Sequence, residues 1–332
     1  MNPINVAIVG ATGNVGRTFL KVLEQRNFPF DSLTCFASAK SAGQTVTCKG
    51  RSYTIEALTE DSFKGRDFTI ALFSAGGDIS KKYAPLAAEA GAVVVDNSSA
   101  WRMDPEVPLV VPEVNADEIP NHKGIIANPN CSTIQAVVAL KPLQERYGIK
   151  RIVYSTYQAV SGSGVKGIAD LAEGLKGNIL KKAYPHSIHN NCLPQIDVFL
   201  DNGYTKEEMK MILETRKILK TPDLAVTATT VRVPIFNCHS ESVNVELEKP
   251  FELNDVVQLF KESPGLVVQN DHMNSEYPLA SIADDTDPVY VGRIRRDESV
   301  ANGLNLWIVA DNIRKGAATN AIQIAEVLIA SK

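Results

Sequence analysis

The sequence has no long apolar run and no marked excess of one charge. Its longest apolar stretches, such as Ala92–Val95 and Ala136–Leu140, fall far short of the roughly 20 residues that cross a bilayer, so we expect no membrane-spanning helix. The 38 acidic and 34 basic side chains give a net charge of −4 without any Lys/Arg-rich segment, which argues against nucleic-acid binding. The N-terminus has no basic stretch followed by a long apolar segment, so we expect no secretory signal and a cytoplasmic location.

Cysteine is scarce, and its pattern lacks any C-x-x-C pair. The five cysteines are Cys35, Cys48, Cys131, Cys192 and Cys238. In a cytoplasmic chain of this length, that pattern argues against both a disulfide framework and a zinc cluster, and we expect no metal site. Internal repeats, low-complexity tracts and long Pro/Ser-rich linkers are also missing from the sequence. The cysteines leave one question, which is whether one of them is a reactive thiol.

The 332 residues, 44% of them hydrophobic and 22% charged, are typical of a soluble globular protein with two domains. The apolar run Ile4–Val9 enters the glycine loop Gly10–Gly16, and apolar residues then recur at helical spacing from Val15. Strand, glycine loop and helix open a Rossmann-type unit, in which glycines let the backbone approach a pyrophosphate. The spacing G-x-x-G-x-x-G is one residue longer than the usual fingerprint, so a tight turn without a ligand stays open as an alternative.

Further apolar runs at Leu33–Phe36, Phe68–Phe73 and Ala92–Asp96 alternate with helical patterns and predict a parallel sheet covered on both faces. Loops at the carboxyl edge of such a sheet bind ligands. The segment after the second predicted strand, Ala37–Gly43, has hydroxyls and Lys40 but no acid. NAD sites usually have Asp or Glu there, about 20 residues after the loop, so the sequence favours NADP. A solvated Lys40 without a ligand is the alternative.

Cys131 follows the short apolar run Gly124–Ala127, and a helical pattern begins just after it at Ile134. A thiol at a helix N-terminus has a lowered pKa, and the same N–H groups can stabilise an oxyanion. With a nicotinamide cofactor, such a thiolate would add to an aldehyde, release hydride to the cofactor and leave a thioester. The chemistry also needs an acid or base. His239 is the most loop-like histidine, although a purely structural role for it is equally open.

Taken together, these motifs resemble aspartate-β-semialdehyde dehydrogenases over nearly the whole chain, in particular a bacterial branch with a shorter second domain that is typical of Gram-positive organisms. The resemblance rests on segments that occur in this order: Gly10–Gly16, Asn97–Arg102, Asn128–Thr133, Gln158–Gly164, and Arg232–Pro234 leading to His239. It implies an α/β protein with an N-terminal Rossmann-type parallel sheet and a second α+β domain of the glyceraldehyde-3-phosphate-dehydrogenase-like type. The implied NADP-binding domain covers residues 1–131, with a C-terminal helix 313–332 returning to it, and residues 132–312 form the catalytic and dimerisation domain.

The resemblance also implies residue roles. Cys131 would be the acylated nucleophile, His239 the general acid/base that takes the thiol proton, and Gln158 the amide that positions the acyl group. Arg232 would bind the substrate carboxylate and Glu214 its ammonium group, while Arg102, Asn130 and Lys217 would hold the phosphate. The implied cofactor-binding residues are Gly10, Thr12, Gly13, Asn14, Val15, Ser38, Lys40, Ser41, Ser74, Ser161, Gly162 and Asn312.

Two spacings leave alternatives open. Glu214 and Lys217 are three residues apart, so on a helix they could form only an exposed ion pair. Arg232 and His239 are seven apart, which regular strand alternation would put on opposite faces unless Pro234 marks a bend.

The strands expected in the second domain are Ile152–Tyr157, Val226–Val233, Val243–Leu247, Val289–Ile294 and Leu304–Val309, flanked by helices over Gly167–Lys182 and Lys206–Leu219.

The implied activity is the NADPH-dependent reductive dephosphorylation of L-aspartyl 4-phosphate to L-aspartate 4-semialdehyde, in the biosynthesis of lysine, diaminopimelate, threonine and methionine. The implied partners are this substrate, phosphate and a second copy of the chain, in a homodimer or a tetramer. The alternatives are N-acetyl-γ-glutamyl-phosphate reductase, which usually has glycine where Asn130 stands, glyceraldehyde-3-phosphate dehydrogenase, and a non-catalytic NADP-binding regulator.

Overall fold

The computed structural model describes residues 3–330, and the chain divides into two compact units. The first comprises Met1–Asn130 and Ala317–Lys332, and the second Cys131–Gly316. The sequence-based boundaries, after residues 131 and 312, differ from these by one and four residues. Among residues 3–330, no helix has the length and apolar character needed to span a membrane.

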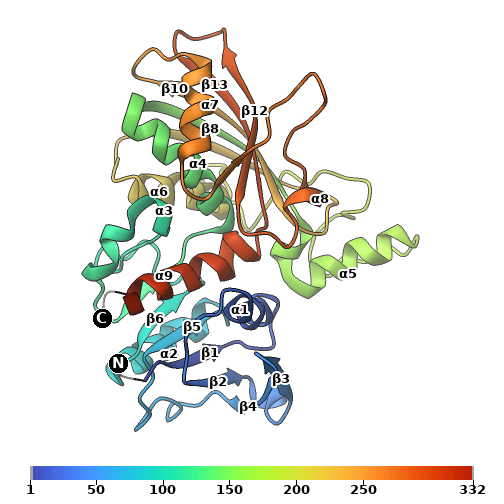
Figure 1. The fold of residues 1–332 in the computed structure, drawn as a ribbon. Helices are drawn as coiled ribbons and strands as arrows, with labels where there is room; N and C mark the ends of the chain where they lie inside the picture. The colour runs from blue at the N-terminus through green and yellow to red at the C-terminus, as the bar shows by residue number, and fades with distance from the viewer. Residues whose placement is uncertain (1–2, 331–332) are drawn as a thin grey trace. The chain divides into compact units, whose positions relative to one another are not determined.

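The first unit contains a seven-stranded sheet in the order β3-β4-β2-β1-β5-β6-β7 (Figure 1). The strands are β1 (Asn5–Val9), β2 (Ser32–Ala37), β3 (Thr45–Cys48), β4 (Arg51–Ala57), β5 (Ile70–Phe73), β6 (Val93–Asp96) and β7 (Ile125–Ala127). Six strands are parallel, which confirms the predicted Rossmann-type sheet, whereas β3 pairs antiparallel with β4. The β3–β4 hairpin was not predicted, because its alternating, half-exposed residues lack the continuous apolar character of the central strands.

Helices cover this sheet and complete the core of the first unit. They are α1 (Asn14–Gln25), α2 (Gly77–Glu89), α3 (Pro112–Asn115) and α9 (Thr319–Ala330). The C-terminal helix α9 packs beside α1 and α3, and buries Ala321, Ile322 and Ala325 in the same core as Val6 and Ile8 of β1. It was predicted to begin at Ile313, but a π-helical turn at Arg314–Ala318 precedes it.

The second unit contains a six-stranded mixed sheet in the order β11-β12-β13-β10-β8-β9. The strands are β8 (Ile149–Gln158), β9 (Ala225–Arg232), β10 (His239–Leu247), β11 (Leu266–Val268), β12 (Val289–Asp297) and β13 (Gly303–Ala310). One face is covered by α4 (Cys131–Tyr147), α6 (Lys206–Ile218) and α7 (Leu253–Glu262), while α5 (Gly164–Leu175) and α8 (Ala280–Ala283) lie elsewhere in this unit (Figure 1).

Helix α5 is shorter than predicted, since it ends at Leu175 rather than Lys182. Gly177 follows with φ of +86°, and the N–H groups of Gly177 and Asn178 donate to carbonyls of the last turn. This is a glycine stop of the kind that ends many helices. Helix α6 begins as predicted at Lys206, because Thr205 and Glu208 form a capping box at its N-terminus.

Candidate active site

The glycine loop of the first unit closes tightly on itself and on the neighbouring strand. A Cβ at Gly16 would lie 2.1 Å from the carbonyl oxygen of Gly10, and one at Gly10 would lie 2.3 Å from that of Ser74. The N–H groups of Gly10 and Ala11 both donate to the carbonyl of Phe36 at the end of β2. The loop is therefore held against the carboxyl ends of β2 and β5, so the longer glycine spacing is built into the fold.

The first turn of α1 is open to a ligand. Gly13 is the N-cap residue and has no side chain to cap the helix, so the leading N–H groups of α1 lack the usual side-chain acceptor. Helix N-termini with this property bind anions such as a pyrophosphate. Since Gly13 is also exposed, the predicted loop residues Thr12, Gly13, Asn14 and Val15 fit the pyrophosphate of a dinucleotide.

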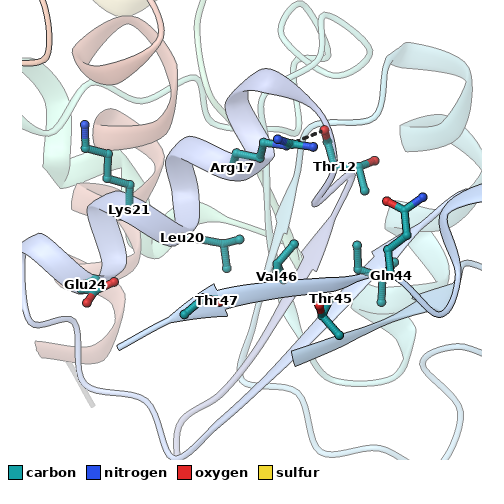
Figure 2. Close-up of a pocket in the computed structure, with 10 residues that line it drawn as sticks. Thr12, Arg17, Leu20, Lys21, Glu24, Gln44, Thr45, Val46 and Thr47 are labelled. Atoms are coloured by element: carbon teal, nitrogen blue, oxygen red, sulfur yellow. Dashed lines mark hydrogen bonds between the residues drawn. The ribbon is translucent and has the colours of Figure 1, made fainter. Parts of the chain in front are cut away.

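A pocket of about 390 Å³ lies beside this loop, between α1 and the β3–β4 hairpin (Figure 2). Arg17 points back along α1 and donates from Nε to the carbonyl of Thr12 at 3.2 Å. Among residues 3–330 the Arg17 guanidinium has no carboxylate partner. The sequence offered no signal for Arg17, because a single arginine in the first turn of an exposed helix face is common.

The predicted 2′-phosphate residues follow β2 directly. Ser38 precedes a short 3-10 turn, Ala39–Ser41, and Lys40 in this turn is exposed. The loop after β5 begins with Ser74, whose hydroxyl accepts from Asn97 at 3.4 Å. All of these residues lie at the carboxyl edge of the first sheet, where open α/β sheets bind their ligands.

Arg102 and Asn130, two of the predicted phosphate ligands, also belong to the first unit and are buried. Arg102 donates from Nε to the carbonyl of Asn128 and from Nη2 to that of Asn97, each at 3.0 Å. These bonds fix the guanidinium on the loops after β6 and β7. The other predicted phosphate ligand, Lys217, is half-buried on α6 of the second unit.

Three predicted catalytic and substrate-binding residues form one row across adjacent strands of the second sheet. Arg232 on β9 is in register with Gln158 on β8, and Ser240 of β10 is in register with Tyr157. His239 therefore stands beside Gln158, so Arg232, Gln158 and His239 share the buried face of the sheet. The spacing problem posed by Arg232 and His239 is resolved because the two residues lie on different strands, separated by β8.

His239 is fully buried as the first residue of β10, so its expected place in a loop was wrong. The loop lies just upstream and ends at Cys238, which has φ of +70°. His239 Nδ1 accepts a hydrogen bond from the N–H of Ala159 at 3.0 Å. A ring nitrogen that accepts from a backbone N–H carries no proton, so the neutral ring has its hydrogen on Nε2.

The backbone of Ala159 also binds Arg232, whose Nη1 donates to the Ala159 carbonyl at 2.6 Å. Burial lowers the pKa of His239 well below its ordinary value, and the Arg232 guanidinium lowers it further. His239 Nε2 is buried and has no hydrogen-bond partner within residues 3–330. It is therefore a neutral donor available to a ligand, and no hydrogen bond joins it to the sulfur of Cys131.

Cys131 is the first residue of α4, in agreement with the predicted helix start, and it is partly exposed. One turn later, Gln135 donates from Nε2 to the backbone carbonyl of His239 at 3.3 Å. Gly316 lies against Cys131, since a Cβ at Gly316 would stand 2.9 Å from the Cβ of Cys131. Gln135 was not singled out from the sequence, although its i,i+4 spacing from Cys131 puts both side chains on one face of the helix.

The other cysteines have different settings. Burial raises the pKa of Cys35 to about 12, and it also raises the pKa values of Cys48 and Cys238. Cys192 is exposed and lies outside helices and strands. In the described part of the chain, Cys131 alone combines partial exposure with the first position of a helix.

One group of potential metal ligands occurs within residues 3–330, formed by Cys238, Asp284 and Asp311. The carboxylate of Asp311 already accepts backbone N–H bonds from Asp285, Ile313 and Arg314. These bonds hold the turn after β13, and they account for Asp311 without a metal.

Glu214 and Ser161 are buried as well. Glu214 is 1% exposed on α6, which excludes the solvent-exposed ion pair with Lys217 that the sequence left open.

Ser161 and Asn312 bind each other through Ser161 Oγ and the Asn312 side chain, at 3.0 and 3.2 Å. Gly162 lies against the row of Arg232, Gln158 and His239, because a Cβ at Gly162 would be 3.0 Å from Arg232 Nη1 and 3.4 Å from His239 Nε2.

Comparisons with known proteins show the family of this chain. Residues 5–122 match the family profile described as "Semialdehyde dehydrogenase, NAD binding domain", and residues 140–315 match "Semialdehyde dehydrogenase, dimerisation domain". A relative from Aquifex aeolicus, named aspartate-semialdehyde dehydrogenase, is 58% identical over 98% of this chain and 97% of its own length. This chain belongs to the aspartate-semialdehyde dehydrogenase family.

Solved structures give the same result. The crystal structure of aspartate semialdehyde dehydrogenase II from Vibrio cholerae, also determined in complex with ASA, is 48% identical, with a TM-score of 0.95 and 99% coverage of both chains. The enzyme from Candida albicans with NADP is 26% identical, with a TM-score of 0.77 and 99% coverage of both chains.

The expected Gram-positive-like branch is not borne out. The Bacillus subtilis relative is 50% identical over 98% of this chain, below the 58% of the Aquifex aeolicus relative and level with the 51% of one from Shewanella violacea. The relatives from Aquifex aeolicus, Shewanella violacea and Bacillus subtilis match this chain at similar identities over nearly the whole length, so the resemblance does not single out one bacterial branch.

Proposed function

We propose that this protein catalyses the NADPH-dependent reductive dephosphorylation of L-aspartyl 4-phosphate to L-aspartate 4-semialdehyde, in the biosynthesis of lysine, diaminopimelate, threonine and methionine. The observation that carries this proposal is the row of Arg232, Gln158 and His239 in the same unit as Cys131, which begins α4. These residues supply a nucleophile, a neutral hydrogen-bond donor and a carboxylate-binding cation.

In the proposed reaction, the Cys131 thiolate attacks the acyl phosphate carbon, the bond to phosphate breaks, and a thioester forms with release of inorganic phosphate. A thiol at the first position of α4 has its thiolate stabilised by the helix N-terminus. The nicotinamide of NADPH would supply the hydride that reduces this thioester. When the resulting thiohemiacetal oxyanion collapses, the C–S bond breaks, which frees the aldehyde and restores the thiolate.

His239 acts in this scheme as a hydrogen-bond donor. Its Nδ1 accepts from Ala159 N–H, so the neutral ring offers Nε2–H and has no lone pair on Nε2 with which to take the thiol proton. A preorganised buried donor stabilises the oxyanion that develops on the substrate oxygen in both addition steps. The hydrogen bond from Ala159 N–H to His239 Nδ1 thus supports His239 as a general acid that donates through Nε2–H. It does not support His239 as the general base that takes the thiol proton.

Charged residues are proposed to recognise the charged groups of the substrate. Arg232 is 5% exposed, and its Nε has no partner within the described residues. A buried guanidinium with an unpaired N–H suits a substrate carboxylate. Glu214 would accept from the substrate ammonium, and Lys217, Arg102 and Asn130 would bind the phosphate.

The cofactor is proposed to be NADP(H), held by the glycine loop at its pyrophosphate and by Ser38, Lys40 and Ser41 at its 2′-phosphate. The Arg17 guanidinium lines the pocket beside the glycine loop, next to Thr12 and without a carboxylate partner in residues 3–330, and is proposed as a further cation for the 2′-phosphate. Ser74, Ser161, Gly162 and Asn312 are the further cofactor residues that the resemblance implies.

We also propose that the protein assembles as a homodimer through the outer face of the second sheet, with a tetramer as the alternative. Tyr157 and Trp307 pack together on this face with ring centroids 5.6 Å apart, and Tyr157, Tyr277 and Leu279 are 37–44% exposed. Light scattering coupled to size-exclusion chromatography would measure the mass of the assembly.

The decisive experiment is an aldehyde panel assayed in the oxidative direction. With phosphate present, the protein should reduce NADP when given L-aspartate 4-semialdehyde, but not N-acetylglutamate semialdehyde or glyceraldehyde 3-phosphate. Without phosphate or arsenate, turnover should stop after acylation. Equal activity on either competing aldehyde would overturn the assignment, and no activity on any of the three would favour the non-catalytic NADP-binding regulator.

A further inference from the structure

A buried carboxylate that the proposed mechanism does not use lies directly against the Gln158 amide. Glu207, in the first turn of α6, is 5% exposed. Its Oε2 lies 3.1 Å from Lys210 Nζ, and its Oε1 accepts from Gln158 Nε2 at 3.3 Å. Lys210 also binds Asp197 Oδ2 at 3.0 Å. A chain of contacts therefore runs from Lys210 through Glu207 to Gln158.

These contacts settle which end of the Gln158 amide faces a ligand. Gln158 Nε2 donates to both Thr156 Oγ1 and Glu207 Oε1, each at 3.3 Å. An ionised carboxylate only accepts hydrogen bonds, so it can face the nitrogen of an amide but not its oxygen. With both amide hydrogens engaged inside the protein, Gln158 Oε1 is the atom left for a ligand.

A second buried acid, Glu241, differs from Glu207 in its hydrogen-bond partners. Glu241 lies on the same sheet face, in register with Thr156, and neither of its carboxyl oxygens has a hydrogen-bond partner within residues 3–330. Burial raises its pKa well above the ordinary value, and the charge of Glu207 raises it further. Of these two neighbouring acids, Glu207 is the one with a cationic partner, since its Oε2 lies 3.1 Å from Lys210 Nζ.

We propose that Glu207 is a positioning residue that fixes the Gln158 amide with Oε1 toward the substrate, so that Gln158 serves as a hydrogen-bond acceptor. This inference rests on the proposed function, in which Gln158 contacts the acyl substrate. Without Glu207, the amide could rotate by half a turn and present Nε2 instead, since the two ends have nearly the same shape. A donor in place of an acceptor would leave the polar groups of the substrate mismatched.

Glu207 also has a structural effect that the test must separate. An acid in the first turn stabilises a helix through its dipole, and Glu208 in the same turn does so through the capping box and a bond from the Thr230 N–H at 3.0 Å. Glu207→Gln and Glu208→Gln thus form a matched pair. Each neutralises one buried acid of the same turn, but only the first acid touches Gln158.

The test combines kinetics with a double-mutant cycle. Glu207→Ala should lower kcat/KM by about tenfold, the size expected for a misaligned hydrogen bond to a charged group. Glu207→Gln should recover part of this loss, because its amide oxygen can still accept from Gln158. Glu208→Gln should lower the melting temperature with kcat/KM within about twofold of wild type. In a Gln158→Ala background, Glu207→Ala should have little further effect.

An equal loss in both backgrounds would overturn the inference, as would wild-type kinetics in Glu207→Ala. A second readout does not depend on catalysis. In protein labelled with ¹⁵N-glutamine, the side-chain amide signals that vanish in Gln158→Ala should shift in Glu207→Ala and stay in place in Glu208→Gln. If those signals behave as stated but wild type lacks activity on the aspartyl aldehyde, the proposed function fails and the assigned amide orientation stands. Unshifted signals in Glu207→Ala would refute the orientation.

Discussion

Gly162→Ala isolates the packing of the row formed by Arg232, Gln158 and His239, because it adds one methyl group against two members of this row. The added Cβ would lie 3.0 Å from Arg232 Nη1 and 3.4 Å from His239 Cε1 and Nε2. The backbone at Gly162 does not have positive φ, so alanine is free of backbone strain there. Any effect must therefore come from the side chains that the methyl group meets.

The magnitude follows from the contacts. Relieving the 3.0 Å contact requires Arg232 Nη1 to move by a few tenths of an ångström, although this atom is tied to the Ala159 carbonyl at 2.6 Å. Overpacking a tight site costs about 1–3 kcal/mol, which corresponds to a loss of roughly 5- to 150-fold if it falls on the transition state. Since the methyl group also crowds Nε2 of His239, we expect a fall in kcat together with a rise in KM for the aspartyl aldehyde.

The assay is steady-state oxidation of L-aspartate 4-semialdehyde with phosphate and NADP, paired with thermal unfolding. Replacing glycine by alanine lowers the entropy of the unfolded chain, which stabilises the folded protein by about 0.4–1 kcal/mol. Because this gain offsets part of the packing cost, the melting temperature should change little. Gly77→Ala is the control substitution, because its Cβ would meet nothing within 4 Å. If Gly162→Ala retains kcat/KM within twofold of wild type, Arg232 and His239 are not tightly packed against Gly162, and the reasoning is refuted.

Three further predictions address separate parts of the proposal. Cys131→Ala should abolish turnover at nearly unchanged melting temperature, and residual turnover would exclude the covalent route. Folding lowers the pKa of His239 below the 6.5 of an unperturbed histidine, so the unfolded state binds the proton first and the free energy of unfolding should fall as pH drops below about 6.5. This slope, measured by urea unfolding between about pH 5 and 8, should be smaller in His239→Gln, and an equal slope in both proteins would refute the assignment. Arg17→Ala and Lys40→Ala should each weaken the binding of 2′,5′-ADP, measured by calorimetry, by about 5- to 20-fold, as expected for the loss of a charge-assisted contact. The binding of 5′-AMP, which lacks the 2′-phosphate, should stay the same. Equal weakening of both nucleotides would show that these cations do not bind the 2′-phosphate.

Local sequence signals predicted those parts of the site that depend on neighbouring residues. The strand, glycine loop and helix at residues 4–25 could be foreseen because glycine spacing and apolar periodicity act over a few residues. The helix start at Cys131 could be foreseen for the same reason, since a short apolar strand and a helical pattern flank it closely. The β3–β4 hairpin and the early end of α5 were missed, because amphipathic strands and glycine stops give weaker local patterns.

The sequence by itself determined the two-domain plan, the Rossmann-type opening, the position of Cys131 at a helix start, and the family. Only the tertiary structure decided that Arg232, Gln158 and His239 form one row, because their alignment depends on the pairing of three strands that are far apart in the chain. It also decided the protonation of His239 and the orientation of the Gln158 amide, through Ala159 N–H and Glu207. Hydrogen bonds of this kind have no sequence signature, since each depends on the position of a partner that the fold brings within about 3 Å.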